Sequence, residues 1–577
     1  MAVDSPFSQA TRTENLAAMA TDPVDLLVIG AGINGAGIAR DAAMRGIRTA
    51  VIDKGDFGGG TSSRSSRLIH GGLRYLEMGH FRLVFESSRE RRTLLRIAPH
   101  LVWPRSFIFP VHKGSRVPRW KLAAGLTLYD LLALFRNVRR HRMLSKKQIL
   151  RAEPNLRSRG LLGGARYYDA QCDDARLTLA NIKSAHAHGA LAANYVLVND
   201  FDPADGTVHR VRATDLVNNS SYTIRARFVV NATGPWSDKL RAKDNAAAAP
   251  VLRRTKGVHV TVDRRRLGNN EAVALTSPID GRVMFVIPWG DLTYIGTTDT
   301  DDLVDPEDAH ATADDVIYLL RSANAYYPDA RLQPDDVIST WAGIRPLIAP
   351  RKATDPSAVS REHRIIESDS GIISVVGGKL TTFRAMAAEV VDVVAEKLRK
   401  LDGRSVPNKA GTDSEPLPGG DVQDLSVLVQ HVVGEGLTVQ TAEHLVRAYG
   451  SETAAVLNLA LADPTLAEPV VPGHPAIRAE LIHAMRREMA VTLSDLLIRR
   501  THIFWEVLGH AVPETPGIVD LVGEELGWDG SRKASELSSY LKEIQDTMAF
   551  RNDLQNGFPR TTPGPGPRSE VPPRREH

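Results

Sequence analysis

The spacing of apolar and polar positions changes part-way along the chain. Between residues 23 and 400, short apolar runs at 25–29 and 49–53 alternate with helical patterns such as 36–44. Short runs of this kind, bounded by glycines, are typical of buried parallel strands. From residue 421 onward the helical period prevails, over 425–433, 441–448, 477–505 and 534–547. The pattern predicts an α/β part followed by a helical C-terminal domain.

Composition marks the limits of these parts. Prolines and paired glycines at 401–420 predict a linker, which leaves 421–550 as the helical domain. Residues 551–577 are rich in proline, glycine and arginine, and such a segment buries too little apolar surface to order itself. We therefore expect a disordered tail at 551–577 and a flexible N-terminal extension over 1–22.

Overall composition excludes several classes of protein. With 577 residues, 42% of them hydrophobic and 24% charged, the chain is ordinary for a globular protein of several domains, not a collagen-like, coiled-coil or wholly disordered one. Cys172 is the single cysteine, which excludes an intrachain disulfide and a cysteine-built metal cluster and fits a reducing compartment. No metal site is expected. The net charge of +4 is small for this length, so no nucleic-acid partner is expected either.

The sequence predicts neither a secretory signal nor a membrane span. Asp4 and Glu14 interrupt the N-terminus, where no basic start precedes an apolar run. No segment reaches the roughly 18 uncharged apolar residues that a spanning helix needs. We expect a cytoplasmic protein, or one that binds a membrane face without crossing it.

A glycine-rich sequence follows the first apolar run. GAGING at 30–35 matches GxGxxG, and the next strand ends in Asp53, about twenty residues further on. Gly30 permits a tight turn, Gly32 lets the backbone approach a pyrophosphate, and Gly35 lets helix and strand pack closely. The helix N-terminus offers N–H groups and a positive dipole to phosphates. Asp53 can accept hydrogen bonds from ribose hydroxyls, so the unit predicts a dinucleotide site.

The fingerprint alone does not separate NAD from FAD. Its position at the start of the fold favours FAD, and the chain has no second GxGxxG for a separate nicotinamide dinucleotide. Two later strands, within 227–236 and 373–384, each run into glycines and so bring backbone N–H groups towards a cofactor. FAD is therefore the expected cofactor.

The segment 61–77, TSSRSSRLIHGGLRYLE, resembles the FAD-dependent glycerol-3-phosphate dehydrogenases of the D-amino-acid-oxidase-like superfamily. Further similar stretches follow in order, at 173–177, 231–236, 256–259, 295–299, 343–346, 377–382 and 495–501. The resemblance covers about 24–505 and leaves out both tails. It implies an α/β fold in which a Rossmann-like FAD-binding domain and an antiparallel-sheet substrate domain interleave over 23–400, with the helical domain after them.

The family resemblance implies a reaction. sn-Glycerol 3-phosphate is oxidised at C2 to dihydroxyacetone phosphate, FAD is reduced, and a membrane quinone reoxidises the flavin. An oxygen-dependent glycerol-3-phosphate oxidase and a non-catalytic membrane-bound flavoprotein sensor remain as alternatives. The 61–77 segment argues against an amino-acid oxidase of the wider superfamily. A homodimer is left open.

The matching motifs also imply cofactor contacts. Serine and threonine hydroxyls at 61–63 suit hydrogen bonds to the cofactor, and His70 lies in a segment expected beside the flavin ring, to which we expect no covalent bond. The implied contacts are Gly30, Gly32, Ile33, Asn34, Gly35, Asp53, Lys54, Thr61, Ser62, Ser63, His70, Gly71, Gly72, Leu73, Gly234, Trp236, Gly378, Lys379, Leu380 and Thr381.

A dianionic phosphate needs cations and forked donors. On the family motifs we assign this task to Arg74, Arg345 and Lys379, with Tyr75 and Thr298 as hydrogen-bond donors. Arg345 is expected in a loop after a strand at 338–341. Asp299 is expected to orient an arginine.

Oxidation at C2 also needs a base for the hydroxyl proton. His259, in the alternating strand 258–262, is the first candidate, because histidine titrates near neutral pH. A histidine satisfied on a sheet face is the competing interpretation. Arg345 is an alternative catalytic residue, which would stabilise the alkoxide that forms.

Basic residues flank an apolar stretch between 113 and 147. The stretch 122–135 has Trp120 at its edge and Asp130 as the one acid nearby, a pattern typical of an interfacial helix. A core helix with solvated ends fits equally well. Reduction of a lipid-soluble quinone favours contact with membrane lipids, on the inner face of the plasma membrane.

Overall fold

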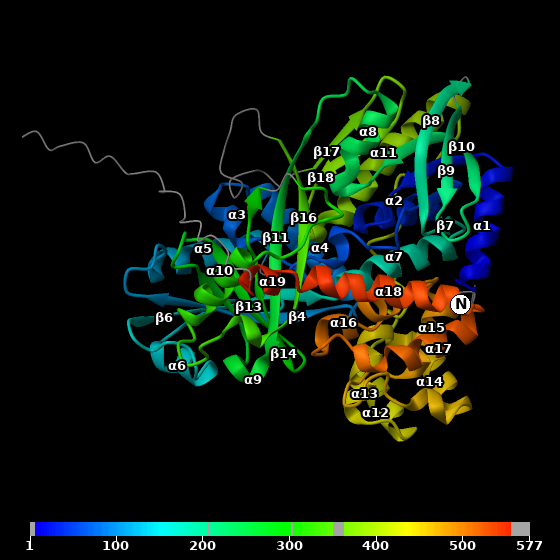
Figure 1. Cartoon of the computed structure of the whole chain (residues 1–577). Helices are drawn as coiled ribbons and strands as arrows, with labels where there is room; N and C mark the ends of the chain where they lie inside the picture. The colour runs from blue at the N-terminus through cyan, green and yellow to red at the C-terminus, as the bar shows by residue number, and fades with distance from the viewer. Residues whose placement is uncertain (1–5, 135–136, 206–207, 302–303, 350–362, 556–577) are drawn as a thin grey trace, which may run out of the picture.

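Two mixed β-sheets and a group of C-terminal helices make up the described part of the chain (Figure 1). This computed structural model describes residues 6–134, 137–205, 208–301, 304–349 and 363–555. The predicted order, an α/β part followed by a helical domain, is confirmed.

The first sheet carries the fingerprint. Its strand order is β17-β18-β10-β1-β2-β7, with β9 added to β10 and β8 to β9. The pairs β18–β10, β10–β1, β1–β2 and β2–β7 are parallel, and every residue of β1 is buried, as a strand covered on both faces requires. The strands are β1 Val24–Ile29, β2 Thr49–Ile52, β7 Leu191–Ala193, β8 Val196–Asp205, β9 Val208–Asp215, β10 Ser221–Asn231, β17 His363–Glu367 and β18 Ile373–Gly377.

Helices cover both faces of this sheet. On one face α2 (Ile33–Met44), α7 (Asp174–Ala187) and α11 (Phe383–Asp402) share a core with Leu26 and Val28. On the other, α1 (Gln9–Thr21) packs Leu16 and Met19 against β1 and β8–β10.

The expectation of a flexible extension over 1–22 is therefore wrong for residues 9–21, while residues 1–5 lie outside the described residues. Ser8 caps α1, and the buried Arg12 pairs with Asp215. The helix is held by burial of one apolar side and by this ion pair, both of which depend on residues far along the chain.

The second sheet supplies the other wall of the site. It runs β15-β11-β14-β13-β12-β4-β6-β3, with β16 paired to β11 and β5 to β6, and all these pairs except β12–β4 are antiparallel. Its strands are β3 Leu68–Ile69, β4 Val102–His112, β5 Arg142–Leu144, β6 Leu161–Cys172, β11 Leu252–Asp263, β12 Ala272–Thr276, β13 Val283–Trp289, β14 Leu292–Gly296, β15 Thr300–Asp301 and β16 Val337–Ile348.

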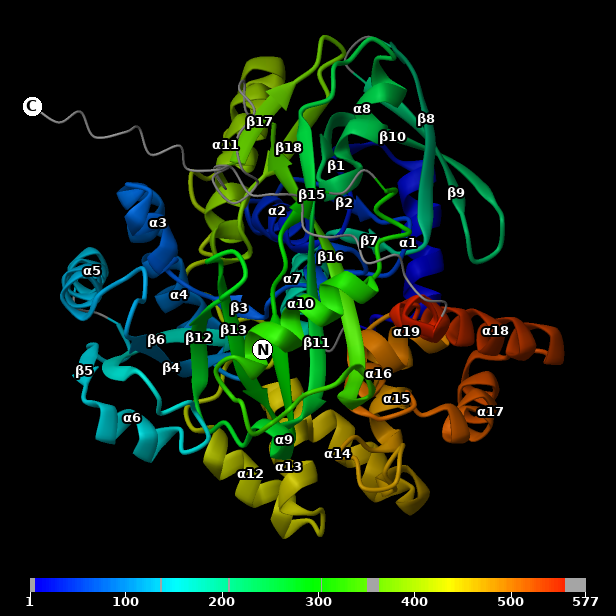
Figure 2. The ribbon, with the colours of Figure 1, turned by 60° about the vertical axis from the view of Figure 1, so that its left-hand side comes forward.

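Arg345 lies within β16 and not in a loop as expected, because β16 continues past Trp341 in unbroken register with β11. The helices around this sheet are α3 Leu73–Glu77, α4 Phe81–Ile97, α5 Arg119–Leu132, α6 Lys146–Ala152, α9 Arg264–Leu267 and α10 Ala313–Asn324, whereas α8 Ser237–Asp244 packs against β8, β10 and β18 of the first sheet. Helices α3 and α5 lie at one edge of the molecule, apart from the C-terminal helices (Figure 2).

The C-terminal helices pack against both sheets. They are α12 Leu425–Gly434, α13 Val439–Tyr449, α14 Thr453–Ala462, α15 Arg478–Arg487, the π-helix η8 Asp495–Arg500, α16 Ile503–Glu506, α17 Thr515–Leu526, α18 Gly530–Thr547 and α19 Phe550–Gln555. The run 477–505 is not one long helix. Helix α15 ends at Arg487, and the next helical segment begins after Thr492, whose Oγ1 accepts the amide of Asp495 while Asp495 Oδ2 accepts the amide of Thr492.

The proposed domain limits differ from the observed elements in small ways. Helix α11 ends at Asp402, and residues 403–420 contain no helix or strand, although Leu417 is buried and its amide donates to Ile97. At the C-terminus, α19 extends the ordered chain to Gln555, and the remaining part of the expected tail, 556–577, lies outside the described residues. Among the helices described, none combines the length and apolar character that crossing a membrane requires.

Candidate active site

A cavity of about 850 Å³ lies where the two sheets meet. The first sheet contributes the loops that follow β1, β2, β10 and β18, and the second contributes β11 and β16. The carboxyl ends of parallel strands are where α/β sheets bind their ligands.

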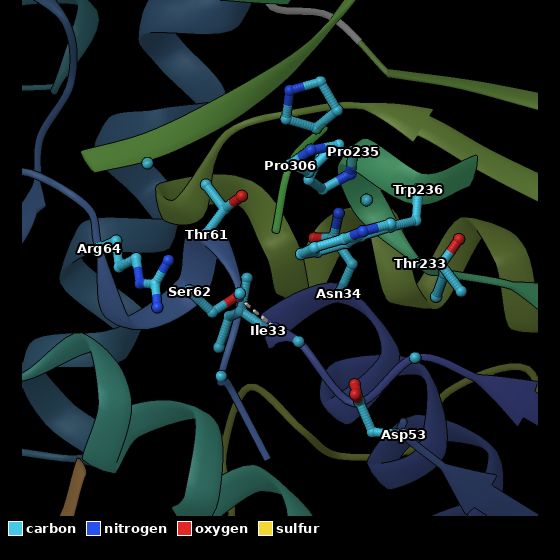
Figure 3. A pocket seen from close by; sticks show the side chains of 18 of the residues that line it. Ile33, Asn34, Asp53, Thr61, Ser62, Arg64, Thr233, Pro235, Trp236 and Pro306 are labelled. Carbon is cyan, nitrogen blue, oxygen red and sulfur yellow. Dashed lines mark hydrogen bonds between the residues drawn. The ribbon is translucent and has the colours of Figure 1, made fainter. Parts of the chain in front are cut away.

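The fingerprint glycines are required by close backbone contacts. Gly30 has φ +100°, and a Cβ there would lie 2.7 Å from the carbonyl oxygen of Ala232. A Cβ on Gly35 would lie 1.8 Å from the carbonyl oxygen of Gly30. The first turn of α2 thus faces the cavity, and the amide of Ile33 donates to Ser62 Oγ over 2.9 Å (Figure 3). A helix N-terminus flanked by glycines, which have no side chains, leaves its backbone N–H groups open to a diphosphate.

Asp53 lies at the end of β2, as a ribose-binding acid should. Its Oδ2 accepts the amide of Ala31 at 2.6 Å and its Oδ1 that of Gly55 at 2.9 Å. Burial raises the pKa of Asp53 to about 6. The ammonium of the next residue, Lys54, lies 4.3 Å from the centre of the Trp236 ring. The buried Nε1 of Trp236 has no hydrogen-bond partner among the described residues. A buried donor on the cavity wall fits a polar cofactor.

The peptide bond between His70 and Gly71 is held on both sides. Lys379 Nζ and Thr381 Oγ1 donate to the His70 carbonyl, and Thr381 Oγ1 also accepts the His70 amide. The Gly71 amide donates to the Tyr129 hydroxyl at 2.9 Å and to Asp169 Oδ1 at 3.2 Å. Lys379 therefore has a backbone partner as well as a place on the cavity wall.

His259 projects from β11 and is buried. Its Nε2 is 2.9 Å from Ser66 Oγ, and its ring stacks on Trp341 with centroids 5.0 Å apart and 15° between planes. Its Nδ1 has no hydrogen-bond partner in the described part of the chain. Burial, followed by the charges of Arg345 and Arg67, holds the pKa of His259 well below its usual value. The imidazole is therefore neutral at pH 7.

Arg345 lies on the neighbouring strand β16, four residues beyond Trp341, which is the cross-strand partner of His259. Its Nη1 pairs with Asp299 at 3.1 Å, and its Nη2 donates to Thr297 Oγ1 at 2.9 Å and to the carbonyl of Thr298 at 3.1 Å. A Cβ on Gly257 would lie 2.1 Å from Nη2, so this glycine makes room for the guanidinium. The side chain is held with its charge beside the cavity.

Three other residues predicted for the substrate, Tyr75, Thr298 and Asp299, are not among those that line the cavity. Thr298 is buried and its Oγ1 accepts the amide of Val258. Tyr75 is buried with its ring 5.2 Å from the Lys379 ammonium. Asp299 contacts Arg345, and the side chain of Arg74 lies outside the described residues.

The predicted cofactor residues also form two groups, those that line the cavity and those that do not. Those that line the cavity are Gly30, Gly32, Ile33, Asn34, Asp53, Lys54, Thr61, Ser62, His70, Gly234, Trp236, Gly378, Lys379 and Leu380. Those outside the lining are Gly35, Ser63, Gly71, Gly72, Leu73 and Thr381.

Several lining residues were missed by sequence reasoning. Arg64 lies within the quoted 61–77 segment, and Arg499 within the quoted 495–501 segment, but neither was assigned a role. Glu543 on α18 carries no sequence signal. The last two come from the C-terminal helices, whose approach to the cofactor loops only the fold reveals.

Two parts of the chain match known protein families. Residues 25–393 match the family described as FAD dependent oxidoreductase, and residues 410–533 match the C-terminal domain of alpha-glycerophosphate oxidase. The aerobic glycerol-3-phosphate dehydrogenase of Staphylococcus haemolyticus is 37% identical over 90% of this chain and 93% of its own length. That of Bacillus subtilis is 36% identical over 94% of this chain and 98% of its own.

Solved structures agree as well. The glycerol-3-phosphate dehydrogenase of Bacillus halodurans complexed with FAD aligns with a TM-score of 0.78 and 34% identity, over 94% of this chain and 98% of that one. The L-alpha-glycerophosphate oxidase of Mycoplasma pneumoniae, at 18% identity and a TM-score of 0.52, shares the fold. The FAD-binding fold and the FAD cofactor are thereby confirmed. The chain belongs to the family of FAD-dependent aerobic glycerol-3-phosphate dehydrogenases.

Proposed function

We propose that this protein oxidises sn-glycerol 3-phosphate at C2 to dihydroxyacetone phosphate. The observation that carries the proposal is that Arg345 and His259 converge on the same cavity as the dinucleotide fingerprint. FAD, when bound, supplies the two-electron acceptor for the hydrogen at C2. The chain itself has to bind a phosphate, orient C2 and accept the hydroxyl proton.

His259 is the proposed proton acceptor. A general base must be unprotonated at working pH, and burial beside Arg345 keeps the imidazole in that state. The Nε2–Ser66 hydrogen bond and the Trp341 stack fix the ring's orientation. Proton transfer to His259 then leaves negative charge on the substrate oxygen, which the Arg345 guanidinium can stabilise.

Arg345 and Lys379 are the proposed cations for the phosphate. Both line the cavity, and both are pre-oriented, Arg345 by Asp299 and Thr297 and Lys379 by the His70 carbonyl. A side chain already held in place loses less entropy when it binds an anion.

Anaerobic reduction tests the substrate. The purified yellow protein should bleach when glycerol 3-phosphate is added without oxygen, and should not bleach with glycine or glycerol at the same concentration. Absence of bleaching with glycerol 3-phosphate would remove the substrate assignment.

A membrane quinone is the proposed electron acceptor, and membrane lipids are the proposed docking surface. Large apolar side chains on α4 and α5 and just after α5 are between 41% and 74% exposed. They are Phe81, Phe85, Trp120, Leu131 and Leu134, with Phe135 outside the described residues. Leu122, Leu126 and Tyr129 on the opposite side of α5 are buried, so the helix is both a core helix and an exposed apolar edge.

An oxygen-dependent oxidase is the second candidate, because the C-terminal match is to a domain described for alpha-glycerophosphate oxidase. Peroxide release decides between them. Turnover in air with stoichiometric peroxide supports the oxidase, whereas turnover with a ubiquinone or menaquinone analogue under nitrogen supports the dehydrogenase.

A further inference from the structure

The loop after β2 contains a fully buried carboxylate that no cofactor motif explains. Asp56 Oδ2 accepts hydrogen bonds from Arg499 Nε at 2.6 Å and Arg500 Nη1 at 2.7 Å, and Oδ1 accepts one from Arg500 Nη2 at 3.1 Å. Asn194 Nδ2 also donates a hydrogen bond to Asp56 Oδ1, at 3.1 Å. Both arginines belong to the π-helix η8 of the C-terminal domain.

The charges around Asp56 are balanced. Arg499 also pairs with Asp495, and Arg500 and Arg176 share Glu488. Asp56, Asp495 and Glu488 thus face Arg176, Arg499 and Arg500, and all of them are buried. Burial works to raise the pKa of Asp56, but the charges of Arg500 and Arg499 outweigh it and hold the pKa below its usual value. The carboxylate is ionised and depends on both arginines.

The same loop determines the shape of the fingerprint. The Gly58 amide donates to the Ala31 carbonyl at 3.0 Å, and the Ala31 amide donates to Asp53 at 2.6 Å. Gly55, Asp56, Gly59 and Gly60 of this loop line the cavity. A shift at Asp56 is therefore transmitted to the backbone that faces the cofactor.

The C-terminal domain also reaches the cavity directly. Arg499 and Glu543 line it together with Arg64, whose pKa is lowered chiefly by desolvation, while the charge of Glu543 acts to raise it and that of Arg499 to lower it. The C-terminal domain and the cofactor loop thus share a wall of the cavity.

We propose that Asp56, Arg499 and Arg500 are positioning residues through which the C-terminal helical domain holds the FAD loop in its binding shape. FAD affinity then depends on a domain that begins far along the chain from the fingerprint. This inference concerns cofactor retention and does not depend on which substrate is oxidised.

The test compares two variants, in each of which one acidic residue of this buried cluster is replaced by its amide. Asp56→Asn and Glu488→Gln each remove one buried negative charge, but only Asp56 belongs to the cofactor loop. Serial dilution of each holoenzyme, read by the fluorescence of released FAD, gives the FAD Kd, and the Tm of the FAD-free protein reports general damage. We expect both variants to lose Tm and only Asp56→Asn to raise the FAD Kd tenfold or more.

Two results would overturn the proposal: a Kd for Asp56→Asn within twofold of the unsubstituted protein, or an equal rise in Glu488→Gln. If Asp56→Asn does not fold, Arg500→Lys takes its place, because it keeps the charge, loses the forked contact and lies outside the cavity lining. We expect at least a threefold rise in its FAD Kd, and an unchanged Kd would contradict the inference.

Discussion

The Tyr129 hydroxyl lies 2.9 Å from the amide nitrogen of Gly71 and donates to Asp169 Oδ1 over 2.6 Å. Arg91 donates to the same hydroxyl at 2.8 Å and pairs with Asp169. A side chain of α5, the helix with the exposed apolar edge, therefore holds the glycine pair beside the cavity. A Cβ on Gly71 would lie 2.3 Å from that hydroxyl, so position 71 has no room for a side chain.

Removal of this hydroxyl should loosen the Gly71 peptide. In Tyr129→Phe the Arg91 guanidinium and the Gly71 amide each lose one buried hydrogen bond but keep Asp169 as a partner, at about 0.5–1.5 kcal/mol per lost bond. We expect a lower Tm together with a several-fold rise in KM for glycerol 3-phosphate, measured by steady-state kinetics with a quinone analogue.

Tyr540→Phe is the matched control, because its buried hydroxyl donates to the His510 carbonyl at 2.7 Å, outside the cavity lining. It should lose Tm and keep KM. Equal changes of KM in both variants would speak against a local effect at Gly71.

Loss of the Arg345 charge should mainly weaken substrate binding. Arg345→Gln removes a largely buried cation from the cavity wall, and the loss of one partner of a buried, hydrogen-bonded charge pair at a binding site costs about 2–5 kcal/mol. A loss of about 3 kcal/mol in binding free energy corresponds to roughly a hundredfold rise in the dissociation constant. We expect KM to rise about a hundredfold or turnover to disappear.

Arg253→Gln serves as comparison, since Arg253 on β11 pairs with the exposed Asp301 and is absent from the cavity lining. An Arg345→Gln enzyme with unaltered KM and kcat would remove Arg345 from the site.

The low pKa of His259 predicts the pH dependence of the reaction. The base works in its neutral form, and burial with Arg345 and Arg67 moves protonation to lower pH. kcat/KM should therefore stay level as pH falls to 6.5 and decline only below it. His259→Gln should lower kcat by roughly 10²–10⁴-fold, the range for general-base catalysis.

A pH series of kcat/KM measures this, with His363→Gln as control, because His363 pairs with Glu389 near the surface. An acid limb centred above pH 6.5, or a His259→Gln enzyme with normal kcat, would be incompatible with His259 as the base.

The exposed apolar edge predicts lipid binding. Trp120 is 74% exposed and Leu131 52%, and burial of such side chains in a bilayer interface stabilises attachment. Trp120→Ser with Leu131→Ser should reduce co-sedimentation with vesicles of anionic lipids at least several-fold, with bleaching by glycerol 3-phosphate unchanged.

Val427→Ser with Leu508→Ser provides the control. These side chains are 62% and 72% exposed. Val427 lies on α12 and Leu508 follows α16, and both helices lie apart from α5 in Figure 2. If the two double variants co-sedimented with the vesicles to the same extent, docking through α5 would have to be abandoned.

The local pattern determined the cofactor half of the site. GAGING at 30–35, the two flanking strands and Asp53 occupy one continuous βαβ unit, in which Gly35 approaches the Gly30 carbonyl and the Ala31 amide donates to Asp53. For this reason the glycines, Asp53 and the FAD-binding fold could be predicted before any tertiary contact was known.

Other features came only from the tertiary structure. The sequence predicts a flexible N-terminal extension, but the segment forms α1, because Arg12 pairs with the distant Asp215. Arg345 reads as a loop residue but lies in β16, because β11 supplies its ladder partner.

The contact between Asp56 and Arg499 spans most of the chain, and no local signal marks it. A sequence determines which segments are apolar, glycine-rich or charged through short-range sterics and burial. Which buried charge meets which partner is decided only when the domains pack, because each ion must be neutralised by whatever the fold brings beside it.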